Sequence, residues 1–279
     1  MKHMESTNIS NEAVTNAVPP NTSISNEDRD SFAVTGKLAL VSTVNANGEP
    51  HITLLTSLQA GKEGEMIFGE FINGLSKKHI KENEKTGFLI MSLKQEWWKG
   101  VCDYFKSEIT GEESEMYNAK PLFRYNTYMG IGVVHYLRLL EISEKNSISM
   151  GKVLKGIIKA KCTGVKKSGV QPLKDISKTL ISKATTLKFI SFINKDGYPE
   201  ILPIIQAQVK DKGRLVVPFS PYAEKLKELE NNQSVAIFCV NLNLTGLLLQ
   251  GKFSHLKSGV GIFDIEKVYN PMPPIIKYI

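Results

Sequence analysis

A serine followed by two lysines stands in the first half of the chain, where Ser76, Lys77 and Lys78 open a predicted helix. The serine supplies a hydroxyl group, and the lysines supply positive charge. If a helix begins here, the free N–H groups of its first turn and its dipole add to the attraction for an anion. An ordinary helix cap followed by solvated lysines has the same pattern, so the motif alone leaves both roles open.

Other residues with chemical potential are scattered along the chain. The three cysteines, Cys102, Cys162 and Cys239, form no Cys-x-x-Cys pair, which excludes a zinc ribbon and a thioredoxin-type centre and fits a reducing compartment. No cluster of His, Cys and carboxylate residues has metal-ligand spacing, so we expect no metal. His135 stands alone in a predicted strand, where a satisfied structural role is favoured over that of a ligand. No residue can be named as a catalytic acid or base.

The composition is typical of a globular protein, with 279 residues, 42% hydrophobic and 23% charged. This length corresponds to one large or two modest domains. The first 30 residues are polar and lack the basic start and apolar stretch of a signal peptide. No apolar run approaches the roughly 20 residues of a membrane helix. We therefore expect a cytoplasmic protein with no membrane partner.

The net charge of +7 is concentrated in one segment. Residues 144–188 contain eleven lysines and two acids, a local charge of +9, which leaves −2 for the rest of the chain. A basic balance would ordinarily suggest nucleic-acid binding. Because the excess belongs to a single connecting segment, we expect no nucleic-acid partner.

An internal repeat organises the chain. Residues 38–50 are echoed 149 positions later by residues 187–199, with five of the thirteen positions identical. Asn47-Gly48 and Asp196-Gly197 are dipeptides that favour tight hairpin turns, because these residue types tolerate positive φ. Each dipeptide stands between runs of β-branched and aliphatic residues, so each copy begins with a predicted β-hairpin.

The echo continues beyond the hairpins. Each copy has about six short strands and one helix after the third strand, which favours a small antiparallel barrel over a parallel sheet. We therefore predict a mainly β protein with two tandem barrels. The predicted division is a polar tail over 1–30, a first barrel over 31–145, a basic helical linker over 146–183 and a second barrel over 184–279. The later strands are predicted near 66–68, 87–91, 101–109 and 133–142, and near 215–217, 235–239, 246–254 and 260–269, with helices over 75–84 and 222–231.

The linker contains two predicted helices, over 149–161 and 173–183. The first is a basic amphipathic helix, since its apolar residues share one face and lysines surround them. The simpler interpretation is that both helices dock on the barrels with their lysines in water. The alternative is a basic surface for an anionic partner, such as a membrane face or a nucleic acid. The apolar residues of the first helix are Val153, Leu154, Ile157 and Ile158.

The order of these motifs resembles the FMN-binding split barrels, the proteins related to pyridoxamine 5'-phosphate oxidase. The resemblance rests on the Asn-Gly-x-Pro turn at 47–50, the Ser-Lys-Lys motif at 76–78 and the Glu-Asn pair at 82–83. It extends over 31–145 in the first copy and over the barrel pattern in the second. It implies two tandem split β-barrels that form an intrachain pseudo-dimer, with the flavin between them. Further homodimerisation stays open.

The resemblance also implies a cofactor and its contacts. The expected cofactor is FMN, with a deazaflavin as the alternative, and the Ser-Lys-Lys motif is expected to bind its phosphate. Thr53 stands where the pyridoxamine-phosphate oxidases place a phosphate-binding arginine, and this departure argues against transferring their specific activity. The implied cofactor-binding residues are His51, Thr53, Thr56, Glu70, Phe71, Ser76, Lys77 and Lys78.

The second copy differs at the same positions. Leu202 replaces Thr53, and the loop that follows the third strand lacks paired lysines. A phosphate there would meet Glu224 and a single nearby lysine, Lys225. We therefore predict one flavin site per chain, in the first copy, with the second copy as its interface partner and Tyr222 as a candidate contact.

The leading functional hypothesis is a flavin-dependent oxidoreductase acting on a small molecule. One alternative is a split barrel that binds or senses flavin, haem or another anionic ligand without catalysis. Another is a deazaflavin-dependent reductase, because the acidic tail of that cofactor would suit the lysine-rich linker.

Overall fold

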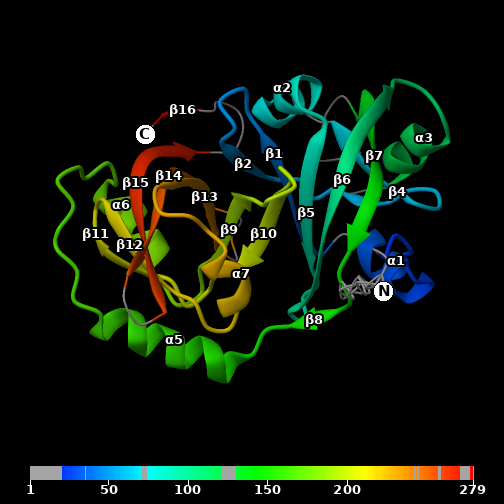
Figure 1. The fold of residues 1–279 in the computed structure, drawn as a ribbon. Coiled ribbons are helices and arrows are strands. Elements are labelled where there is room, and N and C mark those ends of the chain that lie inside the picture. Colours follow the sequence, from blue (N-terminus) through cyan, green and yellow to red (C-terminus); the bar gives the residue numbers. More distant parts are fainter. Residues whose placement is uncertain are drawn as a thin grey trace, which may run out of the picture.

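The computed structural model describes residues 21–34, 36–70, 74–120, 130–241, 243, 245–256, 259–270 and 277–278. Two sheets stand side by side, one built from each half of the chain (Figure 1). Every strand pair is antiparallel. Among the helices described, none combines the length and apolarity needed to cross a bilayer.

The first half follows the order β2-β1-β5-β6-β7-β4-β3, with the short β8 paired to β6. Its buried face includes Leu40, Phe68, Phe88 and Trp98. Helix α2 follows the fourth strand, close to where the sequence predicted a helix. The elements are α1 (Asn26–Ala33), β1 (Leu38–Val44), β2 (Pro50–Leu54), β3 (Gln59–Ala60), β4 (Glu65–Glu70), α2 (Leu75–Glu82), β5 (Lys85–Met91), β6 (Glu96–Glu108), α3 (Glu112–Ala119), β7 (Val133–Ile142) and β8 (Asn146–Ser147).

The second half has the corresponding order β10-β9-β13-β14-β15-β12-β11, with β16 paired to β15. The shared strand order confirms the predicted fold class of two tandem split β-barrels. The elements are β9 (Leu187–Ile193), β10 (Pro199–Pro203), β11 (Gln208–Asp211), β12 (Arg214–Pro218), α7 (Ala223–Lys227), β13 (Gln233–Val240), β14 (Gly246–Leu256), β15 (Val260–Asn270) and β16 (Lys277–Tyr278).

The register of the strands makes the repeat exact at the level of residue pairs. Gly87 pairs with Val101 in the first sheet, and Ala236 pairs with Gln250 in the second, so both partners are 149 positions apart. The last strand departs from this spacing. Glu65 pairs with Arg138, and its equivalent Arg214 pairs with Asp264, so these two partners are only 126 positions apart. The difference, 149 − 126, shows that the connection bearing α3 adds 23 residues to the first half.

The two halves meet through equivalent surfaces. Ser42 and Ser191, which are 149 positions apart, hydrogen-bond to each other through their hydroxyl groups at 2.7 Å. An equivalent residue can contact its own counterpart only near a two-fold axis, so the halves form a pseudo-dimer within one chain. The packing there is close. A Cβ on Gly87 would lie 1.8 Å from the carbonyl oxygen of Pro199 in the other half.

The linker forms the two predicted helices, α5 (Met150–Cys162) and α6 (Asp175–Ser182). Helix α1 begins at Asn26, inside the segment predicted as a polar tail. Its N-cap is Ser25, whose side chain accepts a hydrogen bond from the backbone N–H of Asp28. Its one buried residue, Phe32, packs edge-to-face on Trp98 at 5.2 Å between ring centroids. A single apolar anchor in a polar helix leaves little hydrophobic periodicity in the sequence, which explains why the helix was not predicted.

Candidate functional site

The first candidate site, called site 1, lies where β2 and the start of α2 face the second half. Helix α2 begins after Gly74, an extended N-cap residue with no side-chain hydrogen bond to the helix. Gly74 therefore provides no capping side chain for the N–H groups of the first turn. The positive end of the helix dipole lies at this same end of α2. This end of α2 can attract an anion.

Two residues predicted from separate motifs meet at site 1. Thr53 on β2 and Ser76 in the first turn of α2 hydrogen-bond through their hydroxyl groups. Ser76 is buried and Thr53 is half-buried. One hydroxyl donates to the other, so the pair leaves one O–H for an external acceptor beside the start of the helix.

Two histidines stand next to this hydroxyl pair. The rings of His51 on β2 and His79 on α2 pack edge-to-face at 5.2 Å, and Thr43 hydrogen-bonds to Nδ1 of His79 at 3.1 Å. Burial lowers the pKa of His51 to about 3, with a smaller contribution from His79. Burial also lowers the pKa of His79, against the opposing charge of Glu82. Both rings are therefore neutral at pH 7 and line the site without adding charge.

The second half contributes to site 1. Tyr269 on β15 packs its ring edge-to-face against His51 at 6.4 Å, and Gln250 on β14 donates a hydrogen bond to the carbonyl oxygen of Pro50 at 2.9 Å. Sequence reasoning did not find His79, Gln250 or Tyr269. His79 could have been inferred, since it lies three residues after Ser76 and therefore on the same helix face. The two second-half residues become neighbours only through the pairing of the halves.

The structure separates the three residues of the Ser-Lys-Lys motif. Only Ser76 stands with Thr53. Lys77 is buried, and burial lowers its pKa, an effect that the charge of Glu70 partly offsets. Lys78 points outward with 69% of its side chain exposed, 3.7 Å from Glu82. Successive helix residues are rotated by about 100°, so three adjacent side chains leave α2 in three directions.

Glu70 belongs to a different cluster, at the end of the first barrel. Its carboxylate is 2.7 Å from Nε2 of His135 on β7, and the His135 ring stacks on Phe68 at 4.8 Å. The prediction of a satisfied strand histidine holds only for Nε2, because Nδ1 is buried with no hydrogen-bond partner among the described residues. Burial lowers the pKa of His135, and the bond to Glu70 acts in the opposite direction. Thr56 is half-buried in the turn after β2, and Phe71 lies outside the described residues.

The second half replaces this cluster with apolar residues. The spacings of 149 and 126 positions make Phe219 the equivalent of Glu70 and Gly261 the equivalent of His135. Phe219 stacks on Phe253, which is the equivalent of Tyr104, at 6.2 Å. The barrel therefore closes without a hydrogen-bonded polar pair in one half and contains one in the other.

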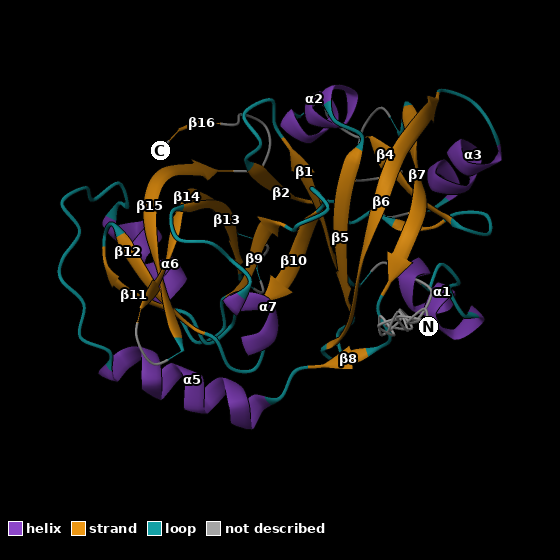
Figure 2. Cartoon of the chain, in the orientation of Figure 1, coloured by secondary structure: helices purple, strands orange, loops and turns teal. Residues whose placement is uncertain are grey.

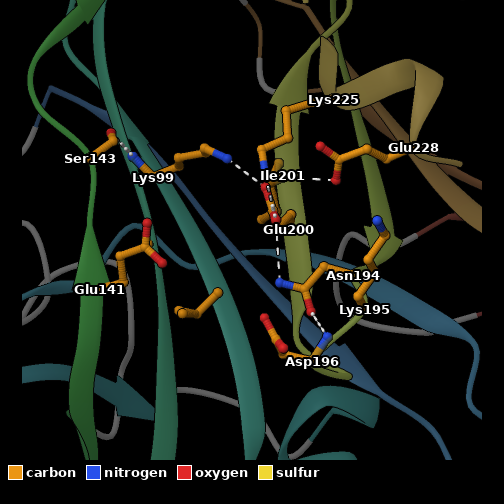
Figure 3. Close-up of a pocket in the computed structure, with 12 residues that line it drawn as sticks. Lys99, Glu141, Ser143, Asn194, Lys195, Asp196, Glu200, Ile201, Lys225 and Glu228 are labelled. Atoms are coloured by element: carbon orange, nitrogen blue, oxygen red, sulfur yellow. Dashed lines mark hydrogen bonds and ion pairs between the residues drawn. The ribbon is translucent and has the colours of Figure 1, made fainter. Parts of the chain in front are cut away.

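The pseudo-two-fold axis generates a second location, called site 2, which contains a cavity of about 350 Å³ between the halves (Figure 3). Residues 149 positions apart occupy equivalent places in the two sites. In site 2, Glu200 occupies the position of His51, Leu202 that of Thr53, Lys225 that of Ser76 and Glu228 that of His79. The cavity is lined by Lys99, Gly100, Val101, Glu141, Ser143, Asn194, Lys195, Asp196, Glu200, Ile201, Lys225 and Glu228.

A buried carboxylate dominates site 2. Glu200, with 9% of its side chain exposed, accepts from Lys99 of the first half at 2.5 Å and from Lys225 at 3.3 Å, and Asn194 donates at 3.3 Å (Figure 3). Burial alone would raise the pKa of Glu200, but Lys99 and the other partners outweigh burial and lower it. The prediction of a single lysine was wrong, because Lys99 enters from the other half. The carboxylates beside Lys225 are those of Glu200 and Glu228, at 3.3 and 3.9 Å, whereas Glu224 is exposed.

Within the described residues, no group of three or more His, Cys, Asp or Glu side chains could hold a metal ion. The predicted contact Tyr222 faces the first half, where its ring packs edge-to-face on Trp97 at 5.8 Å. Both sites therefore join residues of the two halves, but site 1 is lined by hydroxyl groups and neutral rings, and site 2 by an ion network.

No protein-family model matches the sequence, and no curated protein matches it significantly. Among solved structures, the chain is similar to HupZ of Group A Streptococcus, with 22% identity, 43% of this chain and 91% of that chain covered, and a TM-score of 0.36. It is also similar to an FMN-binding protein from Syntrophomonas wolfei, with 15% identity, 43% of this chain and 84% of that chain covered, and a TM-score of 0.37. An F420 reductase matches with 12% identity, 41% of this chain and 94% of that chain covered, and a TM-score of 0.33. Proteins of the class predicted from the sequence are thus among the structures that the chain resembles, while the fold itself is established by the strand order of its own two sheets.

Proposed function

We propose that the protein binds FMN at site 1 and acts as a flavin-dependent oxidoreductase on a small molecule. The observation that carries the proposal is the contact between the hydroxyl groups of Thr53 and Ser76 at the start of α2. Hydroxyl donors, free helix N–H groups and a positive helix dipole are the groups that bind phosphate. A deazaflavin that carries a phosphate is bound by the same groups and remains the alternative cofactor.

The remaining predicted residues have different roles in this proposal. Lys78 is exposed and lies beside Glu82, so its long side chain would have to turn toward the start of α2 to contact a phosphate there. His51 and Tyr269, from opposite halves, are buried rings in contact with each other, and such rings suit the wall of a site for a flat aromatic cofactor. Lys77 is buried near Glu70, whose charge partly offsets the effect of burial on its pKa, and neither residue is assigned a contact with the phosphate.

Site 2 is the poorer candidate for a flavin phosphate. The buried Glu200 carboxylate already uses the charges of Lys99 and Lys225. A phosphate placed beside it would meet a like charge in a partly buried site, which is strongly unfavourable. One flavin per chain, bound at site 1, is therefore the expected stoichiometry.

The bound flavin would supply the electron-transfer chemistry, and this chain would hold and orient it. Neutral histidines at the site can donate or accept hydrogen bonds without placing a charge next to the cofactor. No side chain is assigned a catalytic role.

Titration of the purified protein with FMN, followed by flavin fluorescence, tests the binding site. Ser76→Ala should weaken binding about tenfold or more, because it removes one hydrogen bond to a charged group. Lys225→Ala, at the equivalent position of site 2, is the matched control and should leave the FMN affinity unchanged. Equal losses in both variants, or no binding by the parent protein, would contradict the proposal.

Two further measurements separate cofactor and activity. A mass spectrum of the small molecule that copurifies distinguishes FMN from a deazaflavin. Anaerobic mixing of the flavin-loaded protein with NADH or NADPH should bleach the flavin absorbance. A protein that retains FMN but is neither reduced by these donors nor reoxidised by common acceptors would be a binding module and not an oxidoreductase.

A further inference from the structure

Helix α5 is attached to the second half through small residues. Its inner face buries Val153, Gly156 and Ala160, and Ala160 packs with Val216 and Val260. The backbone approaches so closely that a Cβ on Gly156 would lie 2.7 Å from the Cβ of Gln206. The small side chains of Gly156 and Ala160 explain how the helix docks closely while Met150, Leu154 and Ile158 stay outside the contact.

Those larger residues face solvent. Met150, Leu154 and Ile158 are 60%, 60% and 56% exposed. They are spaced four residues apart, so they form one stripe along the helix. The expectation that the helix would dock with its apolar residues inward was wrong for Leu154 and Ile158. A row of exposed large apolar side chains marks an interaction surface more often than isolated ones do.

The rest of the exposed face is basic. Lys155 and Lys159 follow the side of the helix next to the apolar stripe, and α5 contains no acidic residue. The wider segment 144–188 has eleven lysines and two acids. Helix α5 runs along the outer edge of the second half, on the side of the view opposite α2 (Figures 1 and 2). The surface is therefore separate from site 1.

We propose that α5 docks the protein on an anionic lipid surface, with Met150, Leu154 and Ile158 entering the interface and the lysines contacting the headgroups. A helix with an apolar stripe beside lysines is the form that lies in the plane of such an interface. A nucleic acid would use the lysines but not the aliphatic stripe. A second copy of this face would bring two strongly basic segments together. The proposal departs from the expectation of no membrane partner and does not depend on flavin binding.

Cosedimentation of the full-length protein with vesicles tests the proposal. Vesicles of phosphatidylcholine are compared with vesicles that also contain phosphatidylglycerol, and binding is expected only to the second. Leu154→Ser with Ile158→Ser should weaken binding about tenfold or more, because two large apolar side chains no longer enter the interface. The matched control is Leu93→Ser with Ile109→Ser, which replaces two apolar side chains of the first half that are 85% and 74% exposed. This control should bind the vesicles as the parent does.

The charge contribution is tested separately. Lys155→Gln with Lys159→Gln should weaken binding to the anionic vesicles, and added salt should weaken the parent in the same way. Cys162, the exposed cysteine at the end of α5, can carry an environment-sensitive dye, because Cys102 and Cys239 are buried. Its emission should shift to the blue on binding. Circular dichroism of each variant verifies that the fold is retained.

Several results would overturn the proposal. One is no binding to either vesicle, and another is binding that the apolar double variant does not change, which would indicate adsorption through charge alone. A third is a sedimentation coefficient of the parent that rises with concentration and falls in the apolar variant, which would identify a second copy as the occupant. Tight binding of RNA or DNA that depends on the lysines, without vesicle binding, would identify a nucleic-acid surface.

Discussion

Sites 1 and 2 occupy equivalent positions on the two halves and have opposite chemistry. In site 1, His51 and His79 are kept neutral by burial, and Thr53 and Ser76 offer hydroxyl groups. In site 2, charged residues replace three of these four, and Glu200 binds lysines from both halves. The backbone of the repeat thus positions four side chains at each site, and the residue types decide whether the site can accept an external anion or contains its own.

The same contrast appears at the ends of the barrels. The first half buries the Glu70–His135 pair, and the second fills the equivalent space with Phe219 stacked on Phe253. A buried polar pair is often neutral or unfavourable relative to well-packed apolar residues. The second half closes its barrel without such a pair, so this type of fold does not require it.

The largest expected effect on stability comes from a variant that breaks the ion network of site 2. Lys99→Leu should reduce the free energy of unfolding by about 3 kcal/mol, because Glu200 stays buried with only Lys225 and Asn194 as partners. Urea unfolding measures the loss. Leu248 is the equivalent of Lys99, 149 positions later, so adding Glu200→His gives site 2 the residue types of Leu248 and His51 and should recover most of the stability. A double variant as unstable as the single one would show that the two sites are not interchangeable.

The next effect concerns the contact between the halves. Gly87→Ala should cost about 2 kcal/mol, because its Cβ would lie 1.8 Å from the Pro199 carbonyl oxygen and backbone must move. The equivalent residue in the second half is already Ala236, so the two faces of the interface are not packed alike. Ala236→Gly should cost less, about 1 kcal/mol, mainly through backbone entropy. Urea unfolding of both variants makes the comparison, and equal losses would contradict it.

The two sites should also respond to different ranges of pH. His51 has a pKa near 3 in the folded protein against 6.5 as its ordinary value, so the unfolded chain binds the extra proton. Its contribution to stability is complete above pH 6.5 and is lost as the pH falls toward 3, at about 1.4 kcal/mol per pH unit. The lowered pKa of Glu200 also favours the folded state, but this contribution is lost only below its ordinary value of 4.5.

Two matched variants separate these ranges. His51→Gln should reduce the slope of the unfolding free energy against pH between 6.5 and 4.5, and His79 and His135 account for the slope that remains. Glu200→Gln should leave the slope in that range unchanged and reduce it at lower pH. An unchanged slope in His51→Gln would mean that His51 is not held neutral in site 1.

The smallest expected effect is on stability at the surface of α2. Lys78→Ala removes an exposed pair with Glu82 and should change the free energy of unfolding by only about 0.3 kcal/mol. The equivalent variant in the second half is Lys227→Ala. If site 1 binds FMN, the first variant weakens FMN binding in fluorescence titrations and the second does not. Equal FMN affinities in the two variants would show that Lys78 does not contribute to FMN binding at site 1.

Much of the fold could be predicted from the sequence, because the repeat is encoded locally. Asn47-Gly48 and Asp196-Gly197 form the expected turns, and their glycines have φ of +74° and +83°. The strands were found from alternating and β-branched residues, which require only near neighbours. At site 1, the meeting of Thr53 with Ser76 followed from the resemblance. Which of the three motif residues faces Thr53 could not be predicted locally, because it depends on the rotation of α2 against β1 and β2.

The sequence by itself determined that the chain contains two copies of one β unit, that the excess positive charge lies in the segment between them, and that the hydroxyl groups and paired lysines belong to the first copy. These are properties of residue type and spacing. The tertiary structure decided that Lys99 reaches Glu200 across the interface, that Tyr269 reaches His51, and that Leu154 and Ile158 face outward. Each of these depends on which surfaces of two folded halves and one helix come together, and that choice is made by packing over the whole molecule and not by any local pattern.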